Sequence, residues 1–282
     1  MKDLVFINKS GNPMSLQMFL HNENNVSHKL ITRLKRQHMG ITRNGELIRT
    51  IDTVNPDDKI VLHIDDKQTL EPNSLVYAEI VYEDDFMVIF NKPQGMPVHP
   101  SINHYTDTLG NYFAFLYPDI AFRPINRLDR NTSGLCVIAK NQYSAFSLQH
   151  SISKTYYAVV CGKISEDGVI DAPIARQTES MIKRHVDPEG QRAVTNYKVI
   201  SSCEKYTYVQ ISLQTGRTHQ IRVHFSYIGY PLAGDDLYGG NCEDIRQQAL
   251  HCGNLLCENE NISVSVPVNK NMKDLIERYF PY

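Results

Sequence analysis

The 282-residue sequence lacks long apolar runs. No stretch approaches the ~18 consecutive apolar residues of a membrane-spanning helix, and the opening MKDLVFINKSGNPM has no apolar signal core. We therefore expect a soluble, cytoplasmic protein that does not act in a membrane. A strong charge bias is also missing, because 29 Lys and Arg oppose 31 Asp and Glu and leave a formal net charge of −2. That balance excludes a uniformly basic coat for nucleic acid but allows a local basic patch.

Signatures of cofactors and metals are scarce as well. The sequence has neither a P-loop nor a GxGxxG motif, and none of its six cysteines forms a CxxC pair. In a cytosolic chain these thiols are expected to be reduced. Zinc sites usually have two tight ligand pairs, whereas the only pair among Cys242, His251, Cys252 and Cys257 is adjacent, so that its side chains diverge. We expect no metal and no cofactor.

The composition is that of a globular protein, with 41% apolar and 21% charged residues. From residue 75 onward, apolar runs and turn signals divide the chain into short elements. The predicted strands are 75–85, 86–93, 135–140, 155–164 and 206–216, and the predicted helices are 143–152 and 219–229. Strands and helices do not alternate regularly, so the sequence predicts an α+β protein with a mixed, largely antiparallel sheet.

The charges are unevenly distributed along the first third of the chain. Between residues 27 and 49, six Lys and Arg side chains accompany a single acid, whereas residues 52–85 contain ten acids and two lysines. Such asymmetry indicates a basic binding module followed by a part of different character.

The basic stretch has local structure that can be predicted. Ser27 is a candidate N-cap and Gly40 a candidate helix end. Three cations are spaced to share one helix face: Lys29, Arg33 and Arg36. The Asn44-Gly45 pair that follows is a strong hairpin signal. A phosphate-contacting module and a merely solvated helix face both fit this pattern.

Residues 14–65 resemble the small αL RNA-binding module of a ribosomal small-subunit protein. The resemblance is carried by the basic helix, the Asn-Gly hairpin, and the acidic turn before the strand KIVLHI, while the start LQMFLHNENN fits loosely. It implies that Lys29, Arg33 and Arg36 contact RNA. We expect a module over residues 1–66, a linker over 67–77 and a second domain over 78–282.

A carboxylate between two guanidinium groups stands out in INRLDRNTSGLCVIAK, residues 125–140. Asp129 lies between Arg127 and Arg130, just before an apolar strand. Neighbouring cations favour the ionised form of a carboxylate, which suits a nucleophile or a base and not a general acid. A structural salt bridge at the start of a strand would give the same pattern.

Two further segments contain candidate site residues. Residues 214–224 hold four basic side chains and no acid, which predicts a surface that faces phosphate or carboxylate groups: Arg217, His219, Arg222 and His224. The two histidines are five apart, a poor spacing for a helical metal pair, and we interpret them as packing or hydrogen-bonding groups. In KTYYAVVCGK, Tyr156 and Tyr157 point to opposite faces of a strand, so one can line a site or simply join the core.

Four blocks, in this order, resemble the RluA-type pseudouridine synthases, which isomerise chosen uridines in structured RNA. The blocks are IVYEDDFMVIFNKPQGMPVHP, NRLDRNTSGL with IAK, KTYYAVVCGK, and LQTGRTHQIRVHFSYIGYPLAGDDLYGG. The resemblance covers residues 78–282. It implies the pseudouridine synthase fold, no cofactor, and an RNA substrate that can be ribosomal or transfer RNA, with a monomeric enzyme expected.

The resemblance also implies a role for each matching residue. Asp129 is the implied catalytic aspartate, Tyr156 the active-site tyrosine, and Arg222 the arginine that pairs with the aspartate. Arg127 would enter the RNA stack where the target base leaves it, and Arg217 would contact phosphate. Implied structural residues are Lys92, Pro93, Asp235 and Tyr238. Asn126 departs from the family, in which many members have His at this position.

Two other functions are alternatives to this one. A binding protein that has lost catalysis would be expected to lack Asp129, Tyr156 or Arg222, and all three are present. An Asp-nucleophile hydrolase such as a glycosidase normally needs a second carboxylate, and the doublets Asp84-Asp85 and Asp235-Asp236 are better explained as surface turns. The stretch 239–261 has the character of a local insertion without a functional explanation.

Overall fold

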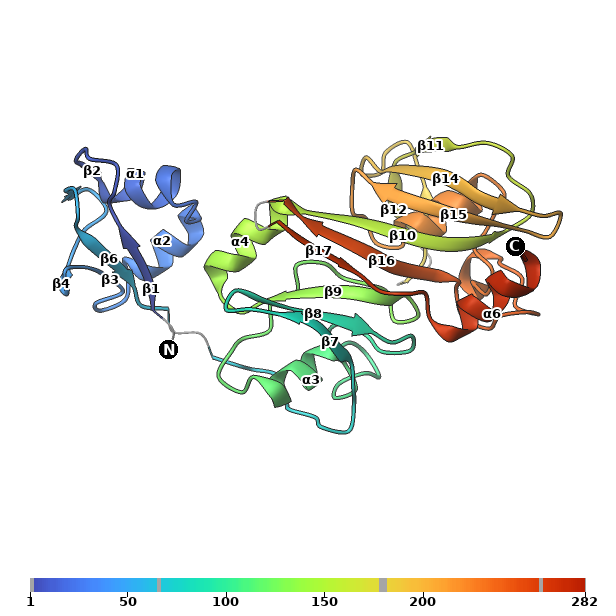
Figure 1. The fold of residues 1–282 in the computed structure, drawn as a ribbon, viewed down its shortest axis with the longest axis horizontal. Coiled ribbons are helices and arrows are strands. Elements are labelled where there is room, and N and C mark those ends of the chain that lie inside the picture. The colour runs from blue at the N-terminus through green and yellow to red at the C-terminus, as the bar shows by residue number, and fades with distance from the viewer. Residues whose placement is uncertain (1–2, 65–66, 178–181, 259–260, 282) are drawn as a thin grey trace.

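The computed structural model describes residues 3–64, 67–177, 182–258 and 261–281, arranged as a small N-terminal part beside a larger C-terminal part (Figure 1). The strands are β1 (Leu4–Ile7), β2 (Met14–Ser15), β3 (Ile41–Arg43), β4 (Glu46–Leu47), β5 (Thr53–Val54), β6 (Lys59–Leu62), β7 (Glu79–Glu83), β8 (Met87–Lys92), β9 (Ser133–Ala139), β10 (Ile152–Cys161), β11 (Gly168–Asp171), β12 (Ile174–Arg176), β13 (Arg184–Val186), β14 (Val194–Ser202), β15 (Tyr206–Leu213), β16 (Leu250–Cys257) and β17 (Ile262–Ser265). The helices are α1 (Leu16–Met18), η1 (Phe19–Glu23), α2 (His28–Leu34), α3 (Leu109–Leu116), α4 (Gln142–Ser151), α5 (Gln220–Tyr227), η2 (Asp236–Tyr238) and α6 (Lys270–Tyr279).

The N-terminal part is a four-stranded sheet, in the order β1-β6-β3-β4, that shares an apolar cluster with α1, η1 and α2. Asn44 and Gly45 join β3 to β4 with φ of 52° and 93°, the positive values that a tight hairpin turn requires. The hairpin prediction is therefore confirmed.

Helix α2 is shorter than the sequence predicted. It begins at the expected N-cap, because the Ser27 side chain accepts the backbone N–H of Leu30, but it ends at Leu34. The chain then turns so that Gly40 lies against the Leu34 carbonyl, where a Cβ atom would collide. The prediction of a helix up to Gly40 is wrong, and Arg36 lies in this turn instead of extending the helical face.

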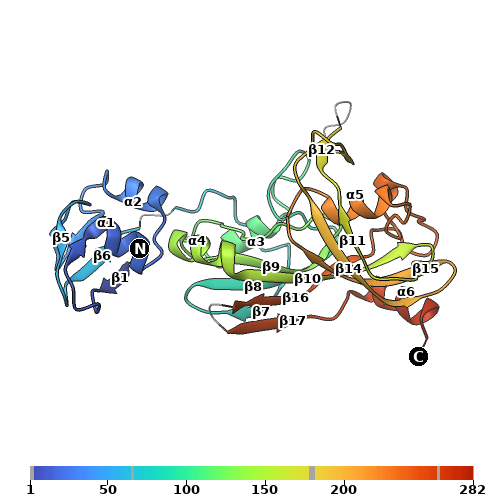
Figure 2. The same ribbon diagram turned by 90° about the horizontal axis from the view of Figure 1, so that it is seen from above.

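The C-terminal part is built on a nine-stranded sheet in the order β11-β14-β15-β10-β16-β9-β8-β7, with β17 added beside β16. Every pairing in it is antiparallel except that of β16 with β9. The predicted α+β fold with a mixed, largely antiparallel sheet is confirmed. Figure 2 shows α3 and α5 over one side of this sheet, from which the hairpin β12–β13 also rises.

The two faces of the sheet carry separate apolar clusters. Ala158 and Val160 of β10 join the large cluster that includes residues of α3 and α5. Val159, between them, packs with Met272 and Leu275 of α6 on the other face. This alternation is the period-two pattern of a strand that is buried on both sides, and it makes β10 a rigid central support.

Strand β16 corrects the interpretation of residues 239–261 as a local insertion. It pairs with β10 on one side and with β9 on the other, so it joins the two halves of the sheet. Its sequence, LHCGNLLC, contains polar residues that do not indicate a central strand. Their side chains are hydrogen-bonded inside the fold. His251 Nδ1 lies 2.9 Å from the Ser133 hydroxyl, and Asn254 donates to the Tyr157 hydroxyl at 3.0 Å.

The segment predicted as a linker lies along the C-terminal part. Gln68 donates to the carbonyl of Ile120 and Asn73 to that of Thr106, both at 2.7 Å. The predicted module boundary at residue 66 falls outside the described residues.

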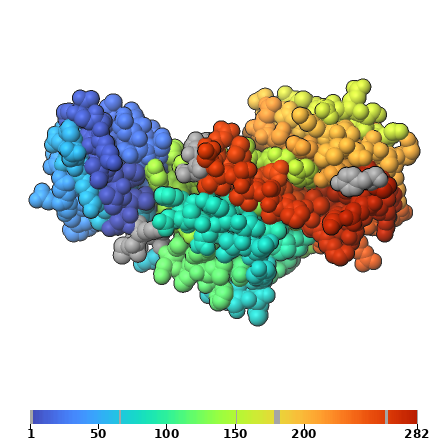
Figure 3. All heavy atoms as spheres, in the orientation of Figure 1, coloured from blue at the N-terminus to red at the C-terminus, as the bar shows by residue number. Residues whose placement is uncertain are grey.

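Phe6 and Tyr143 meet edge to face with centroids 5.5 Å apart, so the N-terminal part contacts α4, as the space-filling view shows (Figure 3). None of the described helices is long and apolar enough to cross a membrane.

Candidate active site

A cleft lies in the C-terminal part where the loop before β9, strand β10 and helix α5 converge. Its lining residues are Arg127, Leu128, Asp129, Thr132, Tyr156, Leu213, Arg217, His219, Gln220, Ile221, Arg222 and Leu250. The cleft thus brings together the five residues for which the resemblance implied a role in catalysis or RNA contact: Arg127, Asp129, Tyr156, Arg217 and Arg222. Residues 127 and 222 are far apart in the sequence. They lie in one cleft because β10 and β16 occupy the middle of the sheet.

Asp129 is paired with Arg222 at the mouth of this cleft. Arg222 Nη1 donates to Asp129 Oδ2 at 3.0 Å, and the side chains are 8% and 28% exposed, so the arginine is buried while the carboxylate reaches the open cleft. The opposite edge of the same guanidinium donates through Nε and Nη2 to both oxygens of Asp235, at 2.7 and 2.8 Å. The arginine therefore bridges two carboxylates, one fully buried and one accessible.

Asp235 fixes the direction in which the arginine points. Its side chain is 0% exposed, and the fork of two parallel bonds is the rigid geometry that Arg and carboxylate form. The Arg222 guanidinium also lies over the Tyr238 ring, 4.9 Å from its centroid. Burial works against the charge on Arg222, but the bonds and charges of Asp235 and Asp129 outweigh it and raise the pKa of Arg222. The arginine stays charged and oriented at any physiological pH.

The loop that carries Asp129 is held from below by a buried lysine. Lys92, at the end of β8, is 0% exposed and donates from Nζ to the carbonyls of Pro93, Met96 and Arg130. Burial lowers the pKa of Lys92 to about 8. Since Arg130 directly follows Asp129, these bonds tie the loop to the sheet, in agreement with the structural role that the resemblance implied.

Asn126, the residue that departs from the family pattern, binds the backbone of β9. It is buried, and its amide donates to the carbonyl of Leu135 at 3.0 Å and accepts the N–H of Val137 at 2.8 Å. Both partners are backbone groups of β9. The side chain therefore clamps the loop to the strand and does not face the cleft opening.

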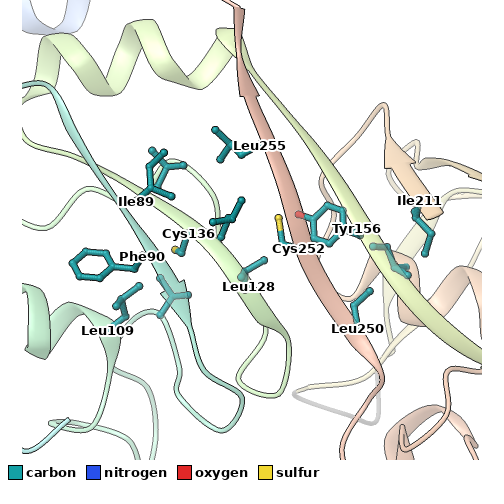
Figure 4. Close-up of a cluster of buried hydrophobic side chains, with 14 of the residues drawn as sticks. Ile89, Phe90, Leu109, Leu128, Cys136, Tyr156, Ile211, Leu250, Cys252 and Leu255 are labelled. Atoms are coloured by element: carbon teal, nitrogen blue, oxygen red, sulfur yellow. The ribbon is translucent and has the colours of Figure 1, made fainter. Parts of the chain in front are cut away.

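Tyr156 presents its ring to the cleft from β10, while its hydroxyl points inward to Cys252 on β16 (Figure 4). The pKa of Tyr156 lies well above its usual value of 10. Burial is the main cause, and the neighbouring Cys252 thiol is the second. Tyr156 is 7% exposed, and its resting form is a neutral phenol at the wall of the cleft.

The basic residues of the N-terminal part lie away from the cleft and line none of it. Lys29 and Arg36 are exposed and Arg33 is half-buried.

His224 has a structural role, as the sequence analysis interpreted it. Its Nδ1 lies 2.9 Å from Thr195 Oγ1 and its Nε2 lies 2.9 Å from the Ala172 carbonyl. Within the described ranges, no group of three or more His, Cys, Asp or Glu side chains is arranged to hold a metal ion.

Sequence reasoning did not assign two residues their place in this site. From the sequence, we interpret Asp235 as structural and His219 as a packing or hydrogen-bonding group. In the structure, Asp235 orients Arg222, and His219 lines the cleft beside Asp129. The partner of Asp235 is set by the tertiary fold, so no signal in the sequence points to its bond with Arg222.

The cleft thus combines an accessible aspartate, a buried arginine that orients it, and a mixed sheet as its floor. The sequence model of the RNA pseudouridylate synthase family matches residues 86–227. The chain therefore belongs to this family, whose members are isomerases that convert uridine to pseudouridine in RNA.

Individual relatives agree with this assignment. An uncharacterized RNA pseudouridine synthase of Bacillus subtilis, YjbO, is 34% identical over 268 residues, which cover 89% of this chain and 95% of the relative. Ribosomal large subunit pseudouridine synthase D of Pseudomonas aeruginosa is 40% identical over 210 residues, covering 71% and 66%. The structure of human RNA pseudouridylate synthase domain containing 1 superposes with a TM-score of 0.58 at 25% identity, covering 74% of this chain and 97% of the human one.

Proposed function

We propose that this enzyme isomerises uridine in large-subunit ribosomal RNA, with Asp129 as the catalytic carboxylate. The observation that carries the role of Asp129 is its position: it is the only carboxylate among the described residues that line the cleft, and Arg222 holds it there. The choice of RNA is supported by a relative at 40% identity that is named for the large ribosomal subunit.

The chemistry needs few groups because no atoms are gained or lost overall. The bond between N1 of uracil and C1′ of the ribose breaks, the base turns, and a bond forms between C5 and C1′. The proton on C5 leaves and N1 ends with one proton. An anionic Asp129 can attack carbon or stabilise a cationic sugar, and Arg222 keeps its oxygen oriented throughout.

The other residues of the cleft handle the base and the backbone. A uridine in folded RNA must leave its stack before it can react, at a cost of a few kcal/mol. Arg127, at the cleft wall, fills the vacated space by stacking and hydrogen bonding, and Tyr156 contacts the extruded base with its ring. Arg217 contacts phosphate.

Tritium release tests this function. Unmodified transcripts of large-subunit RNA, small-subunit RNA and transfer RNA, each labelled with tritium at C5 of uridine, are incubated with the enzyme. Formation of the new bond expels that tritium into water, and we expect release from the large-subunit transcript only. Release only from transfer RNA would overturn the substrate, and an absence of release from all three bound RNAs would overturn the activity on these RNAs.

The N-terminal part is proposed as an αL-type module that adds affinity for RNA without taking part in catalysis. It has a cluster of apolar side chains of its own, and Lys29 and Arg36 project from it into solvent. Each phosphate contact that is removed lowers the salt dependence of binding, measured as the slope of log K against log salt, by about 1.

Replacing Lys29, Arg33 and Arg36 together with glutamine is therefore expected to weaken RNA binding and to reduce this slope by up to about 3. The single-turnover rate on saturating RNA should be unchanged, since these residues do not line the cleft. A matched triple variant of Lys270, Lys273 and Arg278 on α6 controls for the loss of three charges. Unchanged affinity and slope in the first variant would remove the case for the module.

A further inference from the structure

His219 lines the cleft beside Asp129 and has a strained backbone. Its φ is 57°, in the left-handed region that residues other than glycine seldom adopt, although Asn, Asp and His are enriched there. The side chain is 11% exposed, and its Nε2 lies 3.8 Å from Asp129 Oδ2. The strain at the start of α5 thus places an imidazole edge against the catalytic carboxylate.

A chain of hydrogen bonds decides which nitrogen of His219 carries the proton. The backbone N–H of Arg184, on β13, donates to the Tyr238 hydroxyl at 3.0 Å, and that hydroxyl lies 2.8 Å from His219 Nδ1. The Tyr238 oxygen already accepts from Arg184, and we assign its single proton to the bond with Nδ1. A neutral ring then carries its own proton on Nε2, the nitrogen that faces Asp129. The opposite tautomer would aim a lone pair at the carboxylate.

We propose that His219 is a positioning residue for the isomerisation, whose Nε2–H donates to the Asp129 carboxylate when RNA fills the cleft. The inference rests on the proposed role of Asp129. The separation of 3.8 Å exceeds a hydrogen bond, as is common for catalytic pairs in enzymes without substrate. Arg222 is the other donor, and both groups contact Oδ2 of Asp129, which leaves Oδ1 to meet the sugar.

The charged and titratable groups that face His219 come from several elements: Asp129 in the loop before β9, Arg222 on α5, Arg184 on β13, and Asp235 and Tyr238 at η2. Burial is the main cause of a pKa of His219 below 6.5; the two arginines add to the effect and the two aspartates oppose it. The ring is neutral at pH 7. In acid it gains a proton at Nδ1, which reverses the bond to Tyr238 and converts the contact with Asp129 into an ion pair. A carboxylate held by two cations reacts more slowly, so the rate should fall in acid.

Two substitutions separate the Nε2 contact from the rest of the residue. His219→Asn keeps a side chain that accepts the left-handed backbone and has a polar atom where Nδ1 lies, but it does not reach Asp129. His219→Gln places an amide N–H at about the distance of Nε2, without a group that titrates. Single-turnover tritium release from C5-labelled RNA is measured for both from pH 5 to 8, alongside the unmodified enzyme and Asp129→Asn. RNA affinity and melting temperature are measured for each variant.

We expect His219→Asn to react about 10- to 100-fold more slowly at pH 7.5, the effect of losing one bond to a charged group, with RNA affinity unchanged. His219→Gln should recover most of that rate. The rate of the unmodified enzyme should fall below pH 6.5, the acid limb of its pH profile, and both variants should lack this fall. Equal rates for Asn and Gln, or an acid limb that persists in both, would overturn the inference alone. Activity in Asp129→Asn would instead overturn the role of Asp129.

Tyr238→Phe provides a second route if substitutions at the strained position prevent folding. It keeps the ring that packs on Arg222 and removes the hydroxyl that sets the tautomer. A slower reaction with an altered acid limb supports the inference. A pH profile identical to that of the unmodified enzyme overturns it.

Discussion

Asp129→Asn will stop the isomerisation, lowering tritium release by about 10⁴-fold or more, because asparagine has the same shape but no charge with which to attack or stabilise the sugar. Its amide oxygen can still accept from Arg222, so RNA binding and melting temperature should change little. Release is measured under single-turnover conditions, with RNA binding measured on the same preparation.

Asp236→Asn is the matched control for this substitution. Asp236 is exposed and directly follows Asp235, so the change removes one carboxylate close to the site without touching the pair on Arg222. It should leave release unchanged. Substantial release by Asp129→Asn, or an equal loss in both variants, would contradict the assignment of the catalytic carboxylate.

The arrangement of carboxylates also argues against hydrolysis of a glycosidic bond. A glycosidase needs two carboxyl groups at the reacting bond, and Asp235 is unavailable because both its oxygens are bound to Arg222 in a fully buried site. Asp84 closes a turn, where it accepts the backbone N–H groups of Phe86 and Met87. Neither doublet that was considered from the sequence supplies a second carboxylate to the cleft.

Seven elements of the C-terminal part could be predicted because their signals are local: β7, β8, β9, β10, β15, α4 and α5. The apolar runs of β8, β9 and β10 are buried on both faces and read as strands in any window. The Asn44-Gly45 hairpin was equally clear, since its turn type depends on two residues alone. Motifs that lie close to these elements, such as Asp129 just before β9, could therefore be placed correctly.

The rest depends on contacts between distant segments. Strand β16 was missed because its polar side chains find their partners on β9 and β10, and a sequence window contains none of them. The end of α2 at Leu34 depends on how Gly40 packs against the helix. The link between Arg222 and Asp235 depends on how α5 packs beside η2, so the sequence could not assign to Asp235 the role of orienting the arginine.

The bridging position of Arg222 predicts the second large effect. Arg222→Lys keeps the positive charge but replaces a planar fork by a single ammonium, which cannot bind both Asp235 oxygens and Asp129 at once. We expect the single-turnover rate to fall about 10²- to 10³-fold, as when one preorganised donor is lost. The free energy of unfolding should fall by about 2 to 4 kcal/mol, because the buried Asp235 is left poorly paired.

Arg217→Lys is the matched control, because it makes the same substitution in the same cleft. Arg217 is exposed, and among the described residues its Nε donates only to the Arg192 carbonyl. It should weaken RNA binding modestly and leave both the rate on saturating RNA and the stability near their original values. The contrast separates a guanidinium that orients the reacting carboxylate from one that contacts the RNA backbone. If Arg222→Lys lost stability but reacted at the original rate on bound RNA, the arginine would serve only the fold, and Asp129 would have to be oriented by the loop that Lys92 supports.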